Sequence, residues 1–383
     1  MKILQVSNII SHHQLPLARE LRKIVGDENF VFAAMQAPDQ EREKLGWKVE
    51  SSETWVINPS QNKEDRELFE NCWKNFDVVI CGERLFDKML SRVESGKLCF
   101  YMSERWWKPP LGRVRLLAPS FFKMASTFKK LSDSEFFHYL PTGPYAANDI
   151  KTVASPRLNI WNWGYFTSFH NFEVESSNVG PLKILWAGRM LNWKKVDTII
   201  KAVSILKNRG INFKLTLIGE GPERHKLEQL ANNILNDKNY EICDFIPAKE
   251  ITKVMASHDV YVLASTEYEG WGAVVNEAMS VGNAVIASKS TGSAAAMIED
   301  GIDGLLFDSG DWKKLADLLI RLASDREYTA ELGGNARAKI EHQWAPHIAA
   351  ARFVNVVSSL IRDETTPLYE QGPMCRSLCI NDK

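Results

Sequence analysis

The sequence predicts an α/β protein built from two doubly wound, Rossmann-like domains in tandem. Short apolar runs alternate with longer helical patterns along most of the chain, which is the order of elements in a parallel sheet covered by helices. This alternation breaks down at about residues 145 to 181 and then begins again. The chain has 383 residues, a length that allows two or three domains with separate cores.

The first half contains five candidate strands and two clear helical patterns. The strands are expected at residues 2–7, 29–34, 54–57, 77–81 and 97–102. The helices are expected at 14–25 and 63–75, with Leu68, Cys72 and Trp73 on the inner face of the second. We therefore expect an N-terminal domain over residues 1–170.

The second half contains a longer alternating series after a polar linker at 171–181 that ends in Gly180-Pro181. The expected order is strand 183–187, helix 194–208, strand 213–218, helix 222–235, strand 240–244, helix 248–256, strand 259–263, helix 273–281, strand 283–287, helix 293–299, strand 304–307 and helix 311–324. A C-terminal domain is predicted over 182–345, a last helix over 346–362 and a disordered tail over 363–383.

The composition excludes several classes of protein. A net charge of −1 gives the chain no general attraction to nucleic acid or to membranes. The six cysteines are scattered, which favours buried thiols in a reducing compartment over disulfides, and none has histidines at metal-binding spacing. No apolar run reaches the roughly 18 residues that a membrane span needs. The first residues read as a strand and not as a signal peptide, so we expect a cytoplasmic location.

Two cations follow the first strand of the second half. Gly188 allows the backbone to turn after this strand, and Arg189 and Lys194 come next. Open α/β sheets bind ligands at the carboxyl ends of their strands. Arginine binds phosphate through two parallel hydrogen bonds, and lysine supplies a compact charge to the same group. The pair therefore predicts a diphosphate site, with two solvated surface cations as the alternative.

Two glutamates lie further along, separated by seven residues. Glu269 begins the loop Glu269-Gly270-Trp271-Gly272, and Glu277 lies one turn into the next helix. Glycines allow backbone N–H groups to approach a ligand closely. The carboxylates are expected to bind the hydroxyls of a sugar and of a ribose. Alternatively, Glu269 caps the helix and Glu277 is an exposed helix residue, since a carboxylate near a helix start is favourable in itself.

Motifs in this half follow one another in a characteristic order. They are Gly188-Arg189…Lys194, Ile218-Gly219-Glu220-Gly221-Pro222, Glu269-Gly270-Trp271-Gly272…Glu277-Ala278-Met279, Gly282–Ser288 and Gly301–Leu306. The set resembles the retaining glycosyltransferases of family 4, also called group 1, of the type that has seven residues between two glutamates. The resemblance covers about 180 to 325, and several motifs in order are far more specific than one. It implies the GT-B fold: two Rossmann-like domains facing each other across a cleft, with the C-terminal helix packing back toward the first domain.

The resemblance also implies roles for individual residues. Arg189 and Lys194 would bind the donor diphosphate, Glu269 the donor sugar and Glu277 the ribose. The amides of Gly270, Trp271 and Gly272 would lie beside the sugar, and Gly219 and Gly221 near the nucleotide, where their missing side chains leave room for the base. Four positions depart from the family pattern: Trp271 replaces a phenylalanine, Lys195 a glycine, Ala296 a glutamate, and Ser293 the second glycine of a Gly-Gly loop.

The first half offers weaker candidates on the acceptor side. Relatives often have a Gly-Gly loop after the first strand, where this chain has a segment that contains His12 and His13. These histidines could contact phosphate or acceptor, or they could be surface or capping residues. Glu104 and Arg105 follow the strand at 97–102, where many relatives place a histidine. They are acceptor candidates, with a surface salt bridge as the alternative.

Residues 105–130 contain seven cations, no acid and several aromatic side chains. Basic charge with apolar bulk suits a surface that rests on anionic lipid headgroups. The same composition suits nucleic acid, but the donor motifs leave no role for it. An ordinary helix with a solvated basic face and a buried aromatic face explains the composition equally well.

The sequence thus predicts a glycosyltransferase that moves a sugar from a nucleoside diphosphate sugar to an acceptor hydroxyl. A glycan or lipid-linked glycan acceptor is expected, in cell-surface polysaccharide or glycolipid biosynthesis at the inner face of the membrane. No cofactor or metal is expected, because Arg189 and Lys194 would stabilise the departing diphosphate. Two alternatives stay open: another GT-B enzyme, such as a sugar-nucleotide epimerase or a phosphorylase, and a non-catalytic homologue that binds nucleotide-sugar.

Overall fold

The computed structural model describes residues 1–36, 53–108, 110–169, 180–235 and 238–376. The chain divides into two compact units. The first contains residues 1–167 and 343–383, and the second contains residues 168–342. The units end three residues before the predicted boundaries at 170 and 345, and the second unit begins 14 residues before the predicted 182. Most of the predicted linker, 171–179, falls outside the described residues.

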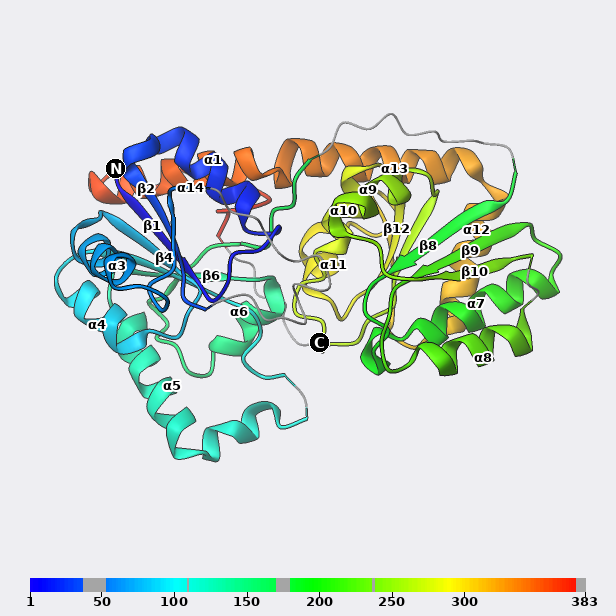
Figure 1. Ribbon diagram of the computed structural model, residues 1–383, viewed down its shortest axis with the longest axis horizontal. Helices are drawn as coiled ribbons and strands as arrows, with labels where there is room; N and C mark the ends of the chain where they lie inside the picture. The colour runs from blue at the N-terminus through cyan, green and yellow to red at the C-terminus, as the bar shows by residue number, and fades with distance from the viewer. Residues whose placement is uncertain (37–52, 109, 170–179, 236–237, 377–383) are drawn as a thin grey trace. The chain divides into compact units, whose positions relative to one another are not determined.

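The first unit is built on a seven-stranded parallel sheet with the order β3-β2-β1-β4-β5-β6-β7 (Figure 1). The strands are β1 (Ile3–Ser7), β2 (Phe30–Ala34), β3 (Val56–Ile57), β4 (Val78–Cys81), β5 (Leu98–Ser103), β6 (Phe137–Pro141) and β7 (Asn159–Ile160). The helices are α1 (Leu15–Val25), α3 (Lys63–Asn75), α4 (Phe86–Glu94), α5 (Pro119–Ser132), α6 (Pro144–Ile150) and α14 (Pro346–Ile361). Because helices cover both faces of the sheet, β1 and β4 are buried at every residue.

The inner face of α3 differs slightly from the prediction. Phe69, Cys72 and Trp73 are its buried residues, whereas Leu68 is exposed. The side chain of Asn62 caps this helix by accepting a hydrogen bond from the backbone N–H of Asp65.

The second unit is built on a six-stranded parallel sheet with the order β10-β9-β8-β11-β12-β13. The strands are β8 (Leu182–Ala187), β9 (Phe213–Ile218), β10 (Tyr240–Cys243), β11 (Val260–Leu263), β12 (Ala284–Ser288) and β13 (Leu305–Phe307). The helices are α7 (Val196–Asn208), α8 (Arg224–Ile234), α9 (Ala248–Ala256), α10 (Val274–Ser280), α11 (Gly292–Met297), α12 (Trp312–Ser324) and α13 (Arg326–Lys339).

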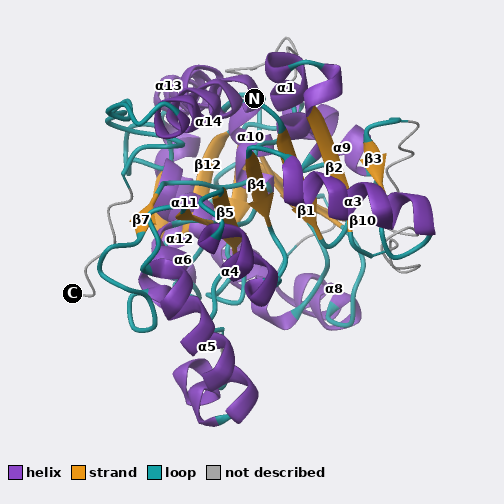
Figure 2. Ribbon diagram, turned by 90° about the vertical axis from the view of Figure 1, so that its left-hand side faces the viewer, coloured by secondary structure: helices purple, strands orange, loops and turns teal. Residues whose placement is uncertain are grey.

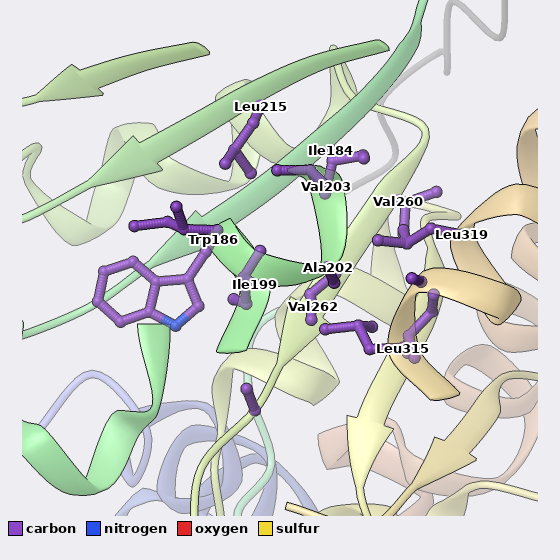
Figure 3. Close-up of a cluster of buried hydrophobic side chains, with 14 of the residues drawn as sticks. Ile184, Trp186, Ile199, Ala202, Val203, Leu215, Val260, Val262, Leu315 and Leu319 are labelled. Atoms are coloured by element: carbon purple, nitrogen blue, oxygen red, sulfur yellow. The ribbon is translucent and has the colours of Figure 1, made fainter. Parts of the chain in front are cut away.

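The core of the second unit forms where this sheet meets its helices. Figure 3 shows side chains of β8, β9 and β11, among them Trp186, Leu215 and Val262, packing against side chains of α7 and α12. Trp186 is fully buried. Nearly every residue of β8 is buried. Close packing around the strand therefore fixes the position of its carboxyl end.

The last helix belongs to the first unit, as predicted. α14 packs against α1 (Figure 1), and Phe353 of α14 meets Phe100 of β5 with ring centroids 4.9 Å apart. No helix of the described residues combines the length and the apolar character that crossing a membrane requires. The five cysteines in the described part of the chain are free thiols, as expected.

The predicted disordered tail is wrong for the residues that the structure describes. Asn162 exchanges backbone hydrogen bonds with the tail, because its N–H donates to the carbonyl of Cys375 (2.8 Å) and its carbonyl accepts from Met374 (2.9 Å). Met374 is fully buried. The polar composition of the tail predicted disorder. Two of its side chains, Met374 and Cys375, are nevertheless buried, and their burial holds the segment against the first unit.

Candidate functional site

The candidate site lies at the point where strand order reverses in the second sheet. From β8 the chain continues to β9 and β10 on one side, whereas β11 begins the series on the other side. In an open parallel sheet, the loops after two such strands diverge and leave a crevice at the carboxyl ends. The loops after β8 and β11 carry Arg189, Lys194 and Glu269.

Two glycines allow the loops after β8 and β9 to lie against each other. A Cβ on Gly219 would lie 1.9 Å from the carbonyl oxygen of Gly188, and one on Gly221 would lie 2.5 Å from that of Met190. The backbone N–H of Met190 donates to the carbonyl of Glu220 (2.7 Å). The missing side chains are therefore explained by contact between two backbones. The sequence-based interpretation, room for a nucleotide base, is not needed to explain these two glycines.

Lys194 and Glu269 form an ion pair within the second unit. The ammonium group of Lys194 donates to Oε2 of Glu269, and the hydroxyl of Ser265 donates to the same oxygen (3.0 Å). The two charged side chains are only 15% and 14% exposed. The ammonium group also lies 4.6 Å from the centre of the Trp193 ring, a distance that allows cation–π attraction.

The backbone holds this pair in place. The N–H of Thr266 donates to the carbonyl of Trp193 (2.9 Å), which ties the loop after β11 to the loop after β8. The residue after Lys194, Lys195, adopts a left-handed conformation (φ 54°, ψ 40°). That conformation explains why the family pattern has a glycine at this position.

A third loop supports the turn Gly270-Trp271-Gly272. The N–H groups of Gly292 and Ser293 donate to the carbonyls of Gly270 (3.2 Å) and Trp271 (3.0 Å). The Ser293 hydroxyl donates to the carbonyl of Gly272 (3.1 Å). Gly272 has φ +88°, and a Cβ there would lie 2.9 Å from Leu263. A second glycine at position 293 would lack this hydroxyl. The Ser293 side chain therefore adds a hydrogen bond that holds the turn in place.

The predicted role of Trp271 concerns its backbone amide, and its side chain has a structural role of its own. Its side chain is 1% exposed, and its indole N–H donates to Oδ1 of Asn276 (2.8 Å). The indole therefore belongs to the core of the unit. Only the backbone of this residue is in a position typical of ligand binding, at a glycine-flanked turn.

Glu277 is a buried residue of α10 and not an exposed helix residue. Burial raises the pKa of its carboxyl group to about 8, because removal from water disfavours the charged form. Perturbed carboxyl groups of this kind are typical of functional sites. The alternative interpretation of Glu277 as a solvated surface residue is wrong.

Tyr261 of β11 is hydrogen-bonded to the end of β8. Its hydroxyl donates to the carbonyl of Ala187 (3.0 Å). Burial raises the pKa of the Tyr261 phenol above its ordinary value, and the carboxylates of Glu277 and Glu269 raise it further. Both glutamates therefore act on the same phenol. Arg189 follows β8 directly and its side chain is exposed.

The two histidines after β1 lie together in the first unit. The rings of His12 and His13 are 3.7 Å apart, and the ring of Tyr165 lies 6.1 Å from that of His13. Burial lowers the pKa of His12 to about 4 and that of His13 below its ordinary value. Both imidazoles are therefore neutral at pH 7 and can exchange hydrogen bonds with a ligand.

Glu104 and Arg105 have internal partners. Glu104 accepts hydrogen bonds from Lys108 (2.6 Å) and from the Tyr165 hydroxyl (3.2 Å). The guanidinium of Arg105 donates to both carboxylate oxygens of Asp149 (3.3 and 3.2 Å). These contacts favour the salt-bridge interpretation of both residues over direct acceptor binding.

Three residues of the site were not identified from the sequence: Ser265, Tyr261 and Ser293. A tyrosine in an otherwise apolar strand is the one usable signal among them, because a buried hydroxyl requires a hydrogen-bond partner. Ser265 and Ser293 carry no such signal. Their partners, Glu269 and Gly272, are defined only once the loops are folded.

Comparison with known proteins places these motifs in context. Residues 168–339 match the family described as glycosyl transferases group 1. The chain is 29% identical to the amylovoran biosynthesis glycosyltransferase AmsK of Erwinia amylovora, over 53% of this chain and 51% of that protein. It is 30% identical to an uncharacterised glycosyltransferase of Methanocaldococcus jannaschii, over 72% of this chain and 74% of that protein. The first match spans only about half the length of its relative.

Two solved structures share the architecture of the whole chain. The lipopolysaccharide outer core galactosyltransferase WaaB has a TM-score of 0.70 at 16% identity, over 94% of this chain and all of that one. HepE of Anabaena in complex with UDP has a TM-score of 0.67 at 16% identity, with the same coverage. At this identity the likeness concerns the fold alone, and it confirms two parallel-sheet Rossmann-like units of the GT-B class.

Proposed function

The chain belongs to the group 1 glycosyltransferases, and we propose that it transfers a sugar from a nucleoside diphosphate sugar to an acceptor hydroxyl with retention. The observation that carries this proposal is the ion pair of Lys194 and Glu269 at the strand-order reversal. A cation for the diphosphate and a carboxylate for the sugar meet there, although 75 residues separate them in sequence.

The ion pair prepares the site for a donor. Each partner holds the other at the end of its strand before the donor arrives, so little ordering remains to be done on binding. The donor diphosphate would then accept hydrogen bonds from Lys194, and the sugar hydroxyls would donate to Glu269. Ser265 keeps the Glu269 carboxylate in this orientation.

The chemistry of the transfer follows from the charges. As the bond between the sugar and the diphosphate breaks, negative charge grows on the leaving group. Lys194 and Arg189 would stabilise that charge, Arg189 through two parallel hydrogen bonds. On this proposal the two cations supply the stabilisation, and we expect the reaction to proceed without a metal.

Retention needs attack on the same face of the sugar from which the diphosphate leaves. A carboxylate nucleophile is the usual solution in glycoside hydrolysis. Here Oε2 of Glu269 already accepts from Lys194 and Ser265, which lowers its nucleophilicity. We therefore propose that the acceptor hydroxyl attacks on the side of the leaving phosphate and passes its proton to that phosphate.

Donor and acceptor are proposed from the relatives. HepE was solved with UDP, AmsK is named for amylovoran biosynthesis, and a relative from Corynebacterium glutamicum is named as GDP-mannose-dependent. We propose a UDP- or GDP-sugar as donor and a glycan or lipid-linked glycan as acceptor, in cell-surface polysaccharide or glycolipid biosynthesis. His12 and His13 are the proposed acceptor-side residues, and the enzyme would act in the cytoplasm, on the inner face of the membrane.

The test combines donor binding with turnover. Thermal shifts with UDP-, GDP- and ADP-sugars identify the donor, because a ligand of the native state raises the melting temperature. With that donor, Lys194→Ala and Glu269→Gln should each lower kcat/KM by about 100-fold or more, the usual effect of losing one stabilising group. Release of nucleoside diphosphate is the measured quantity.

Matched controls lie close to each residue. Glu267→Gln changes an exposed carboxylate two residues from Glu269, and Lys201→Ala removes a lysine of α7 that pairs with Asp197. Both controls should retain the kcat/KM of the unaltered protein. Turnover at the normal rate in Lys194→Ala and Glu269→Gln would refute the proposal. Donor binding without any turnover would instead indicate a non-catalytic homologue.

A further inference from the structure

The first unit carries a surface that the proposed reaction does not use. It is formed by α5 and by the 3-10 helix η3 (Gly112–Leu117) that precedes it. Figure 2 shows α5 extending beyond the strands of the unit. We call it the basic apolar surface and define it by four apolar and five charged residues: Leu111, Val114, Leu117, Phe122, Arg113, Arg115, Lys123, Lys129 and Lys130.

The apolar residues of this surface are unusually exposed. Leu111 is 54% exposed, Val114 61%, Leu117 83% and Phe122 66%. They are four of the ten large apolar side chains that the described residues expose, and they lie within twelve consecutive positions. Scattered exposed apolar residues are ordinary, but a cluster marks an interaction site.

The cations of the surface have no acidic partners among the described residues. Of the seven cations between 105 and 130, Arg105 pairs with Asp149 and Lys108 with Glu104. The remaining five, which belong to the basic apolar surface, form no ion pair with any carboxylate in the described part of the chain. Their charge is therefore available to an anionic partner.

Part of the aromatic content has an internal explanation. Trp106, Trp107 and Phe128 are buried in the core of the unit, and the backbone N–H of Trp107 donates to Asp149 (3.1 Å). A helix with a buried aromatic face thus accounts for these three residues. It does not account for Leu117 and Phe122, which point outward.

The helical geometry brings apolar bulk and charge to one face. Ala125, Phe128 and Leu131 form the buried stripe of α5. Phe122 and Lys129 are seven residues apart, so they lie almost in line along an exposed flank of the helix, beside the buried stripe. The exposed face of α5 therefore presents an aromatic ring near its start and lysines in its last turn.

A hollow of about 420 Å³ adjoins this face, between α4 and α5. Its lining includes three cations, Arg84, Lys88 and Lys123, and one carboxylate, Asp87. Lys88 is also paired with Glu70. The lining of the hollow thus has more cations than carboxylates, next to the exposed apolar residues. A lipid with an anionic headgroup and acyl chains matches this combination of charge and apolar surface.

We propose that the basic apolar surface docks the protein on an anionic lipid bilayer. The side chains of Leu117 and Phe122 enter the boundary between headgroups and acyl chains, while the five cations contact the lipid phosphates. The hollow between α4 and α5 holds one headgroup. Nucleic acid fits less well, because three of the four exposed apolar residues are aliphatic and do not stack with bases.

The inference rests on the first unit alone and does not depend on the donor chemistry. For a lipid-linked acceptor, docking would raise the local concentration of substrate at the protein. The same surface would leave binding of a nucleotide-sugar in solution unchanged.

Flotation of the full chain with vesicles tests the proposal. Vesicles contain phosphatidylcholine alone, or phosphatidylcholine mixed with phosphatidylglycerol. The protein should float with the mixed vesicles and be released by high salt, which screens the lipid charge. Lys129→Glu with Lys130→Glu should weaken binding by about 25-fold or more, since each cation contributes about fivefold. Leu117→Ser with Phe122→Ser should weaken it by about tenfold or more.

Matched controls change the same residue types elsewhere on the first unit. Lys23→Glu with Lys63→Glu alters two exposed lysines, and Leu368→Ser alters a leucine that is 81% exposed. Both controls should bind the mixed vesicles like the unaltered protein. Equal loss in controls and test variants, or equal binding to phosphatidylcholine alone, overturns the proposal.

Two further outcomes separate this inference from the proposed function. Thermal shifts by the donor should be the same in all of these variants. If vesicle binding is absent but turnover is intact, the docking proposal fails and the function stands. If a labelled single-stranded oligonucleotide binds through Lys129 and Lys130 and vesicles do not, the surface is a nucleic-acid site and the proposal fails.

Discussion

Gly219 shows how a single residue type fixes the geometry of the candidate site. Its backbone lies against that of Gly188, the residue before Arg189, and a Cβ would lie 1.9 Å from the Gly188 carbonyl oxygen. No rotamer change relieves such a clash, because both groups are part of the backbone. The position of Arg189 therefore depends on a residue that carries no functional group.

We expect Gly219→Ala to lower the free energy of unfolding by about 3 kcal/mol or more, because two backbones must separate. Urea unfolding measures this quantity. Gly210→Ala is the control: Gly210 has φ +68° but no atom within 4 Å of its Cβ position. It should cost only the roughly 1 to 2 kcal/mol of a left-handed alanine. Equal costs at the two positions would refute the packing explanation.

At the scale of elements, the segment after α14 completes the first unit. An isolated bridge joins Trp161 to Arg376, and the Arg376 guanidinium lies 3.9 Å from the centre of the Trp161 ring. The side-chain amide of Asn162 donates to the Gly372 carbonyl (3.0 Å). These contacts place residues 372–376 beside the edge strand β7 and cover an otherwise open sheet edge.

Deletion of residues 371–383 should therefore lower the free energy of unfolding of the first unit. The loss should be about 2 to 5 kcal/mol, the usual cost of removing a buried methionine from a core, since Met374 is fully buried. Deletion of residues 377–383 keeps the described contacts and should have little effect. Denaturant unfolding of both truncated chains provides the comparison. Equal stability of the two would contradict the assigned role.

At the scale of the molecule, each unit has its own sheet and its own core. The residues proposed to bind the donor, from Gly188 to Glu277, lie within the second unit. We therefore expect the two units to unfold separately, and donor binding to stabilise only the second unit.

Scanning calorimetry should resolve two transitions. A donor nucleotide at about 100 times its dissociation constant should stabilise the second unit by about 2.7 kcal/mol. For a unit of this size that corresponds to a rise of roughly 5 to 10 °C in one transition only. Gly219→Ala should lower the same transition, which identifies it. An equal rise of both transitions would show that donor binding is not confined to the second unit.

The sequence predicted the second unit closely and the first unit less well. The predicted strand 213–218 and helix 248–256 coincide with β9 and α9. Elements α4, β6, α6, β7 and α13 were not predicted, and α5 was only one of the alternatives for residues 105–130. α13 contains Gly333, where a Cβ would lie 2.0 Å from the carbonyl oxygen of Gly282. A glycine inside a helix weakens the helical signal, and its reason lies in a neighbouring loop.

The sequence by itself determined the fold class, the two-unit organisation and the residues of the donor motifs. Burial patterns and local turn chemistry are properties of short segments, so they can be read along the chain. Only the tertiary structure decided that Lys194 meets Glu269, that Trp271 belongs to the core, and that Leu117 and Phe122 remain outside it. Contacts between distant residues depend on strand order, and no short segment encodes the order of strands in a sheet.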